Sequence, residues 1–177
     1  CFGISLDGVH RWLALGPIKF QPSMLLLPAI TCLFASNRTA LGVIAIIMAA
    51  AALAFQPDRA MAGALLFAMF VVLAFKRDWP TAIATSASAV GFAVTMMRPD
   101  GLPAVAFVEG VYQSAFQTHV LLGLMVITAS IILLLAPIIA RQNIPRVSAY
   151  ALAACWFAIM FGAVMGNYPL KGTDKQV

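Results

Sequence analysis

The sequence predicts an all-α integral membrane protein, a polytopic helical bundle of about six transmembrane helices. Composition is the first observation behind this prediction. Of the 177 residues, 63% are hydrophobic and only 10% are charged, against about 25% charged residues in a soluble domain. The mean hydropathy is +0.97. The second observation is that long apolar stretches alternate with short connectors that carry nearly all the charge. The chain has too little polar surface to cover a soluble globule.

The expected spans follow from the thickness of a bilayer core, about 30 Å, which a helix of about 17–25 apolar residues crosses. Stretches with this length, or nearly so, cover residues 20–36, 39–55, 60–75, 80–97, 120–140 and 147–165. Each is apolar on every face, whereas a strand of a membrane barrel alternates, so helices are expected. We therefore expect one multi-pass membrane domain over residues 1–177.

The first three spans have recognisable starts. The first is expected to start near Pro22, because proline is tolerated in the first turn of a helix, while Pro28 is expected to kink it. The second follows the polar Asn37-Arg38 corner. The third follows Asp58, whose carboxylate can accept a hydrogen bond from a free N–H group and complements the positive end of the helix dipole.

The last three spans differ in composition. The fourth is rich in hydroxyl side chains (Thr81, Thr85, Ser86, Ser88 and Thr95). These hydroxyls can donate to carbonyl groups of their own helix or of a neighbour, so we expect a buried span. In the fifth, Pro137 is expected to kink the helix. Residues 98–119 form a long connection between the fourth and fifth spans, and connections of such length are often functional.

The charge and cysteine content of the chain exclude several classes of function. The formal net charge is +5, but the 11 Lys and Arg residues are spread over the chain. Without a basic cluster, nucleic acid is not an expected partner. The two expected sides hold five and six of these cationic residues, so the charges set no orientation. The three Cys residues form no paired framework, and we expect no disulfide, metal site or cofactor.

The most informative stretch is Gly8-Val9-His10-Arg11-Trp12-Leu13-Ala14-Leu15-Gly16, followed closely by Phe20-Gln21-Pro22-Ser23. A further short motif is Gln56-Pro57-Asp58. Together these motifs resemble the SEDS family of bacterial cell-shape and division membrane proteins, which includes FtsW, RodA and SpoVE. In that family a Gly-x-Arg-Arg-Trp-x-x-Leu-Gly loop runs into a Gln-Pro-Ser-Glu helix start, and Gln-Pro-Asp ends the next helix. The resemblance is specific over residues 8–23 and weak beyond Asp58.

The resemblance implies a compact or partial SEDS-like protein of the bacterial plasma (inner) membrane. The family has three spans before the Arg-Trp loop, so the chain is expected to be N-terminally incomplete. The implied roles are peptidoglycan synthesis, cell division or cell-shape control. The family's activity is glycan polymerisation from lipid II, an undecaprenyl-pyrophosphate-linked precursor. Its partner is a class B penicillin-binding protein within the divisome or elongasome, and its Arg-Trp loop and Gln-Pro-Asp corner face outward.

Polar residues are expected to gather at one face of the bilayer, where they could bind a lipid with a pyrophosphate head group. The candidate binding residues are His10, Arg11, Trp12, Gln21, Ser23 and Arg59. Arginine suits pyrophosphate because its planar fork donates paired hydrogen bonds. Lys19, Arg98 and His119 are expected at the same face. Taken singly, interfacial Trp and Arg residues are also ordinary membrane anchors.

Two carboxylates are candidates for a catalytic role. The resemblance implies a catalytic Asp in an outer loop, and the matching position here is Val108, with Glu109 beside it. Between apolar neighbours at a membrane face, Glu109 could have a raised pKa and act as a general base. Glu109 could also be a solvated loop charge or an acid at a helix start. Asp58 is the weaker candidate, because helix capping already accounts for it.

Departures from the family pattern leave alternatives open. The family's Glu and Lys after Gln-Pro-Ser are replaced by Met24 and Leu27, and the first Arg of its Arg-Arg pair is His10. The alternatives are a non-catalytic SEDS-like scaffold or regulator, and a small membrane transporter unrelated to the cell wall. We also expect the loop over residues 8–16 to fold back onto the bundle, because Trp12 and its neighbours give it an apolar edge.

Overall fold

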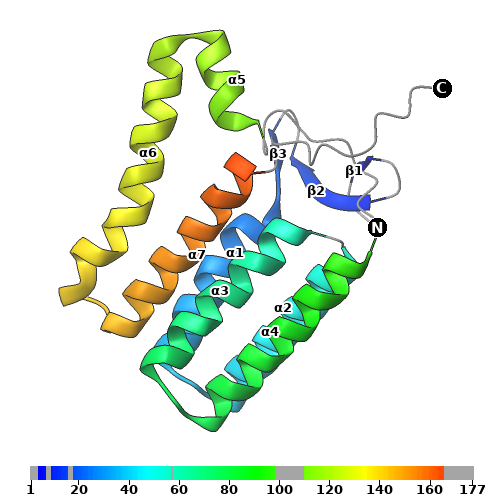
Figure 1. Ribbon diagram of the computed structural model, residues 1–177, viewed down its shortest axis with the longest axis vertical. Helices are drawn as coiled ribbons and strands as arrows, with labels where there is room; N and C mark the ends of the chain where they lie inside the picture. The colour runs from blue at the N-terminus through cyan, green and yellow to red at the C-terminus, as the bar shows by residue number, and fades with distance from the viewer. Residues whose placement is uncertain (1–3, 7–8, 16–17, 57, 99–109, 166–177) are drawn as a thin grey trace.

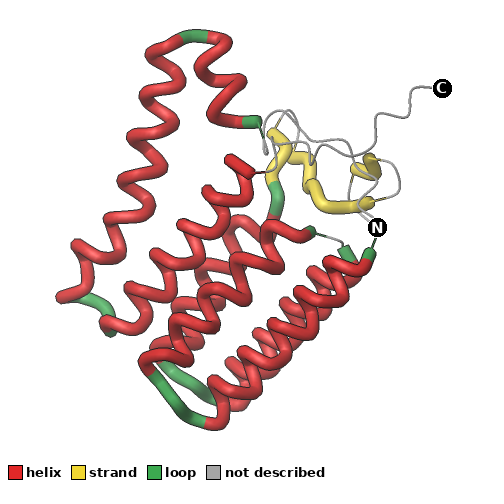
Figure 2. Tube along the Cα trace, viewed as in Figure 1, coloured by secondary structure: helices red, strands yellow, loops and turns green. Residues whose placement is uncertain are grey.

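The computed structural model of the chain describes residues 4–6, 9–15, 18–56, 58–98 and 110–165. These residues form a helical bundle with a small antiparallel sheet at one end (Figures 1 and 2). The helices are α1 (Pro22–Ser36), α2 (Ala40–Phe55), α3 (Arg59–Phe75), α4 (Trp79–Met97), α5 (Val111–Thr118), α6 (Val120–Ile139) and α7 (Arg146–Met165). A short 3-10 turn, η1 (Ala140–Gln142), links α6 to α7.

The six predicted helical stretches coincide with α1–α4, α6 and α7, each within two residues at either end. The helix starts agree with their capping residues: Thr39, Asp58 and Asp78 each accept a hydrogen bond from the backbone N–H three residues further on. Three helices, α4, α6 and α7, are long and apolar enough to cross a membrane, judged by length and composition alone. Helices α1, α2 and α3 are apolar but shorter, with 15, 16 and 17 residues.

Helix α3 lies at the centre of the bundle, in contact with α1, α2, α4 and α7. Its apolar side chains are completely or almost completely buried at Leu65, Met69 and Val72. Helix α4 packs on α2 and α3. The hydroxyls of Thr85, Ser88 and Thr95 donate to carbonyls of their own helix, as expected, whereas Thr81 Oγ1 is buried without a hydrogen-bond partner within the described residues. Thr85 Oγ1 donates to the carbonyl of Thr81 at 2.8 Å and lies 3.3 Å from the carbonyl of Met69 in α3. One face of the fourth predicted helix is therefore buried and carries most of its hydroxyls, whereas the opposite face, which includes Ile83 and Val90, is exposed.

Helix α6 lies at the edge of the bundle, and among the described helices it contacts α5 and α7 (Figure 1). Within the described residues of α6, only Gly123 and Pro137 are buried. Large apolar side chains are exposed along its length, including Leu121, Leu124, Ile132 and Leu135. Helix α5 was not predicted, because residues 98–119 were expected only to form a long connection between two spans. It packs on α6, and the Tyr112 hydroxyl lies 2.9 Å from the Ser130 hydroxyl.

The expectation of a loop over residues 8–16 is wrong. Residues 9–15 form strand β2 (Val9–Leu15), which pairs antiparallel with β1 (Ile4–Leu6) on one side and β3 (Ile18–Phe20) on the other. Two neighbouring strands provide hydrogen-bond partners for the backbone of the motif, which a loop at an apolar surface would lack. Strand β2 also contacts α1, so the segment does fold back onto the bundle.

Candidate functional site

The helices run alternately up and down, so residues that are distant in sequence meet at the two ends of the bundle (Figure 1). One end holds the starts of α1 and α3, the ends of α2 and α4, and the sheet. We call Gln21, Asp58, Arg59 and Arg98 at this end the polar rim. The sequence predicted that these four residues would lie on the same side, and the structure confirms that they share one end of the bundle.

The centre of the polar rim is a contact between Gln21 and Asp58, both of which are buried. Gln21 Nε2 donates a hydrogen bond to Asp58 Oδ2. The other carboxylate oxygen, Oδ1, accepts from the backbone N–H of Met61 at 3.1 Å and so caps α3, as expected. Asp58 thus holds the starts of α1 and α3 together, although 37 positions separate the two residues.

Two arginines continue the rim toward α2 and α4. Arg59 Nη2 donates to the carbonyl of Arg98 at 2.9 Å, and Arg98 Nη1 donates to the carbonyl of Phe55 at 3.2 Å. The Arg98 guanidinium also lies 5.8 Å from the centre of the Phe55 ring, within the range of a cation–π contact. Within the described residues, neither arginine has a carboxylate at salt-bridge distance. Arg59 Nε is buried there without a hydrogen-bond partner.

The other predicted site residues are placed only in part. His10, Arg11 and Trp12 lie on β2, next to the start of α1, and their side chains are outside the described part of the chain. Ser23 lies in the first turn of α1 and is half-buried. Glu109, the preferred catalytic candidate, is outside the described residues.

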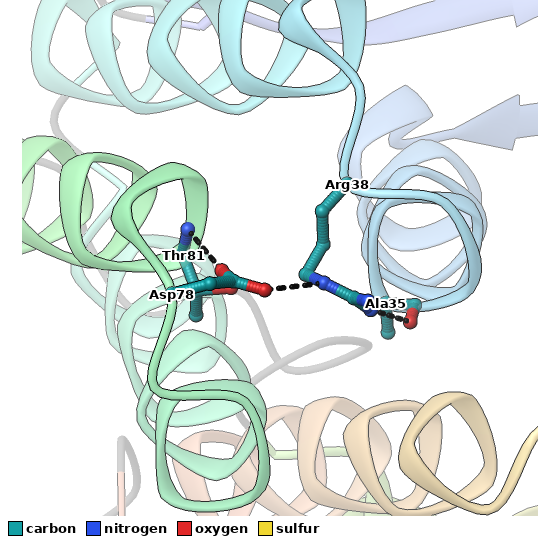
Figure 3. Close-up of polar contacts among 4 residues, drawn as sticks. All are labelled: Ala35, Arg38, Asp78 and Thr81. Atoms are coloured by element: carbon teal, nitrogen blue, oxygen red, sulfur yellow. Dashed lines mark hydrogen bonds and ion pairs between the residues drawn. The ribbon is translucent and has the colours of Figure 1, made fainter.

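The opposite end of the bundle carries an ion pair (Figure 3). Arg38 Nε lies 2.7 Å from Asp78 Oδ2, while Arg38 Nη1 donates to the carbonyl of Ala35 at 3.1 Å. Asp78 Oδ1 accepts from the backbone N–H of Thr81 at 3.0 Å and caps α4. Partial burial raises the pKa of Asp78, but the hydrogen bonds from Thr81 and the Arg38 guanidinium outweigh it and hold the pKa below its usual value. This contact joins the α1–α2 corner to the α3–α4 corner.

The two ends differ in the partners that their arginines have within the described residues. At the Arg38 end, within the described residues, cation and carboxylate neutralise each other across two helix corners. At the polar rim, Asp58 is held by Gln21 and a helix start, and the two guanidinium groups donate to carbonyl groups. Donation to neutral carbonyls leaves the positive charge available to an anion.

Sequence reasoning missed two side-chain contacts of this site and the sheet beside it. It did not predict the direct contact between Gln21 and Asp58, or the part that Phe55 plays in positioning Arg98. The signal for the first was present: both residues immediately precede a helix that starts at the same end of the bundle. For the sheet, the signal was Asp7-Gly8 between apolar segments, a dipeptide typical of two-residue hairpins.

The described residues form a helical bundle with a polar rim at one end, and three of its helices are long and apolar enough to cross a membrane, by length and composition. No protein-family model, curated protein or solved structure matches this chain.

Proposed function

We propose that this chain is a multi-pass protein of the bacterial plasma membrane that binds an undecaprenyl-pyrophosphate-linked precursor at the polar rim. It would act in peptidoglycan synthesis, cell division or cell-shape control, as the SEDS-like motifs imply. The observation that carries the proposal is the pair of arginines, Arg59 and Arg98, which donate only to carbonyls within the described residues at the end of an apolar bundle. A pyrophosphate offers the acceptor oxygens that such guanidinium groups bind best.

The exterior of the bundle supports a membrane location. Soluble proteins rarely expose continuous apolar patches of more than a few hundred Å², whereas α6 exposes large apolar side chains from Val120 to Ile139. In a bilayer these side chains would contact lipid or a partner helix at no cost in hydration. The proposal includes six crossings, in which α1, α2 and α3 are shorter than usual. Short helices are accommodated by local thinning of the bilayer.

The proposed partner is a class B penicillin-binding protein of the divisome or elongasome, as the resemblance implies. The exposed face of α6 would suit a partner helix in the membrane, because helices associate there through close packing. The proposed catalytic group is Glu109, which would take the proton from the sugar hydroxyl that attacks the anomeric carbon of the lipid-linked chain. The bond from that carbon to the pyrophosphate would break, and undecaprenyl pyrophosphate would leave.

One observation favours the non-catalytic alternative, a SEDS-like scaffold or regulator. At the positions where the family has Glu and Lys, this chain has Met24 and Leu27. Leu27 is part of the buried core and Met24 packs against it. These positions therefore have an apolar packing role and could not contribute charge to a reaction.

Incubating the purified full chain with fluorescent lipid II, with and without a class B penicillin-binding protein, tests the proposal. We expect lipid II to bind, and glycan strands to form on a gel if the protein is a polymerase. Lipid II binding without glycan strand formation would indicate the non-catalytic scaffold or regulator. Binding no stronger than that of the neutral lipid phosphatidylcholine would contradict the proposed function as a whole.

A further inference from the structure

An open groove of about 490 Å³ runs between α2 and α4 on the outer surface of the bundle. On α2 it is lined by residues from Ile47 to Phe55, and on α4 by residues from Ser86 to Arg98. The lining residues recur at intervals of three or four, so each helix contributes one face. The walls are almost entirely apolar, and Arg98 stands at the end that belongs to the polar rim.

The groove exists because the two helices approach closely at its floor. A Cβ atom added to Gly91 would lie 2.9 Å from the carbonyl oxygen of Ala50 and 3.0 Å from its Cβ. Small side chains on both sides, including Ala51, Ala54 and Ala87, leave the space above this contact open. The groove is therefore a fixed feature of the α2–α4 packing.

The length of the groove matches one leaflet of a bilayer. At about 1.5 Å per residue, its walls extend over about 12 Å on α2 and about 18 Å on α4. One leaflet of the hydrocarbon core is about 15 Å deep, half of about 30 Å. The groove thus runs from the polar rim to the middle of the bundle, which is the space that one lipid tail fills when its head group lies at Arg98.

The positive charge of Arg98 at the open end of the groove favours a lipid with an anionic head group. The Arg98 guanidinium is held by Phe55, through its carbonyl and its ring, and uses one N–H in the hydrogen bond. Its other N–H groups are available to an anion, since within the described residues no carboxylate lies at salt-bridge distance. An arginine fixed at the mouth of an apolar groove is complementary to a phosphate joined to an apolar chain.

We propose that the α2–α4 groove binds one acyl chain of an anionic phospholipid, with the lipid phosphate at Arg98. The second chain of the lipid remains in the bilayer. This inference goes beyond the proposed function, because a phospholipid carries no glycan and its binding requires no reaction. Both proposals use Arg98, so the phospholipid and the pyrophosphate-linked lipid would compete for its guanidinium group. The bound lipid would fill the gap between the two helices and neutralise Arg98.

The test uses the full chain in detergent, incubated with equal amounts of phosphatidylglycerol and phosphatidylcholine, with bound lipid counted by native mass spectrometry. We expect the wild type to retain about five times more phosphatidylglycerol than phosphatidylcholine, because one basic side chain near a membrane surface favours an anionic lipid by about this factor. Arg98→Gln should bring this ratio close to one. Ala87→Phe, which fills the groove, should lower retention of both lipids severalfold.

Matched controls separate the groove from general effects. Arg77→Gln removes an exposed arginine at the other end of the bundle, and Ala93→Phe adds a ring to an exposed position of α4 outside the groove. Both should behave as the wild type. If Ala87→Phe loses helical signal in circular dichroism, Ala51→Phe fills the groove from the α2 wall instead. An unchanged lipid ratio in Arg98→Gln, or equal losses in Ala87→Phe and Ala93→Phe, would overturn the proposal.

Discussion

Replacing Asp58 with alanine is expected to lower the free energy of unfolding by about 1.5–5 kcal/mol. Loss of a helix cap costs about 0.5–2 kcal/mol, and a buried donor left unsatisfied costs about 1–3 kcal/mol more. Asp58→Ala causes both losses, because the carboxylate caps α3 and accepts from the buried Gln21 amide. Chemical unfolding in detergent, followed by circular dichroism, measures the change.

Asp78→Ala is the matched control for this substitution. Asp78 caps α4 with the same geometry, but its ion pair with Arg38 is partly exposed. Exposed pairs contribute only about 0–1 kcal/mol, so the loss should be closer to that of a cap alone. In a double-mutant cycle, Gln21→Ala should cost less in the Asp58→Ala background than in the wild type. Equal effects of Asp58→Ala and Asp78→Ala, with no coupling to Gln21, would mean that the buried contact contributes nothing.

Glu109→Gln is expected to lower lipid II polymerisation by about 10²–10⁴-fold, the usual contribution of a general base. The amide keeps the size of the side chain but cannot take up a proton at neutral pH. Lipid II binding should remain, because binding is assigned to the arginines of the polar rim. Strand formation and lipid retention, measured on the same preparation, separate the two effects.

Asp78→Asn provides the control here, since it neutralises a carboxylate at the opposite end of the bundle and asparagine caps a helix about as well. Its polymerisation rate should stay within a few-fold of the wild type. A strong defect in Asp58→Asn beside an unchanged rate in Glu109→Gln would assign the functional carboxylate to Asp58. Polymerisation that is unaffected by either change would exclude both carboxylates as the base.

The helices could be predicted from the sequence because their ends have local causes. Thr39, Asp58 and Asp78 cap helices through side chains only three residues from their donors, and the stretches between these corners are continuously apolar in the sequence. Helix α5 was missed because it is short and amphipathic, and it is stabilised by packing on α6. Such tertiary support leaves no strong local pattern.

The site could be predicted only as a shared end of the bundle. Alternating helix directions place Gln21, Asp58, Arg59 and Arg98 together whatever their exact packing. Which side chain contacts which depends on the rotation and spacing of helices. The groove between α2 and α4 depends in the same way on the close approach of Gly91 to Ala50. The sequence does not show which residue of another helix packs against a given glycine, so the groove could not be predicted.

The central claim, a membrane-spanning bundle whose polar rim faces outward, is tested most directly by cysteine accessibility in intact bacterial cells. In a background without native cysteines, single substitutions would be made at the exposed positions Gln56, near the polar rim, and Arg77 and Asn143, at the opposite end. We predict that a membrane-impermeant maleimide labels Gln56→Cys in intact cells, and labels Arg77→Cys and Asn143→Cys only after permeabilisation. Labelling of Gln56→Cys and Arg77→Cys from the same side would contradict the account, because α3 would then not cross the membrane.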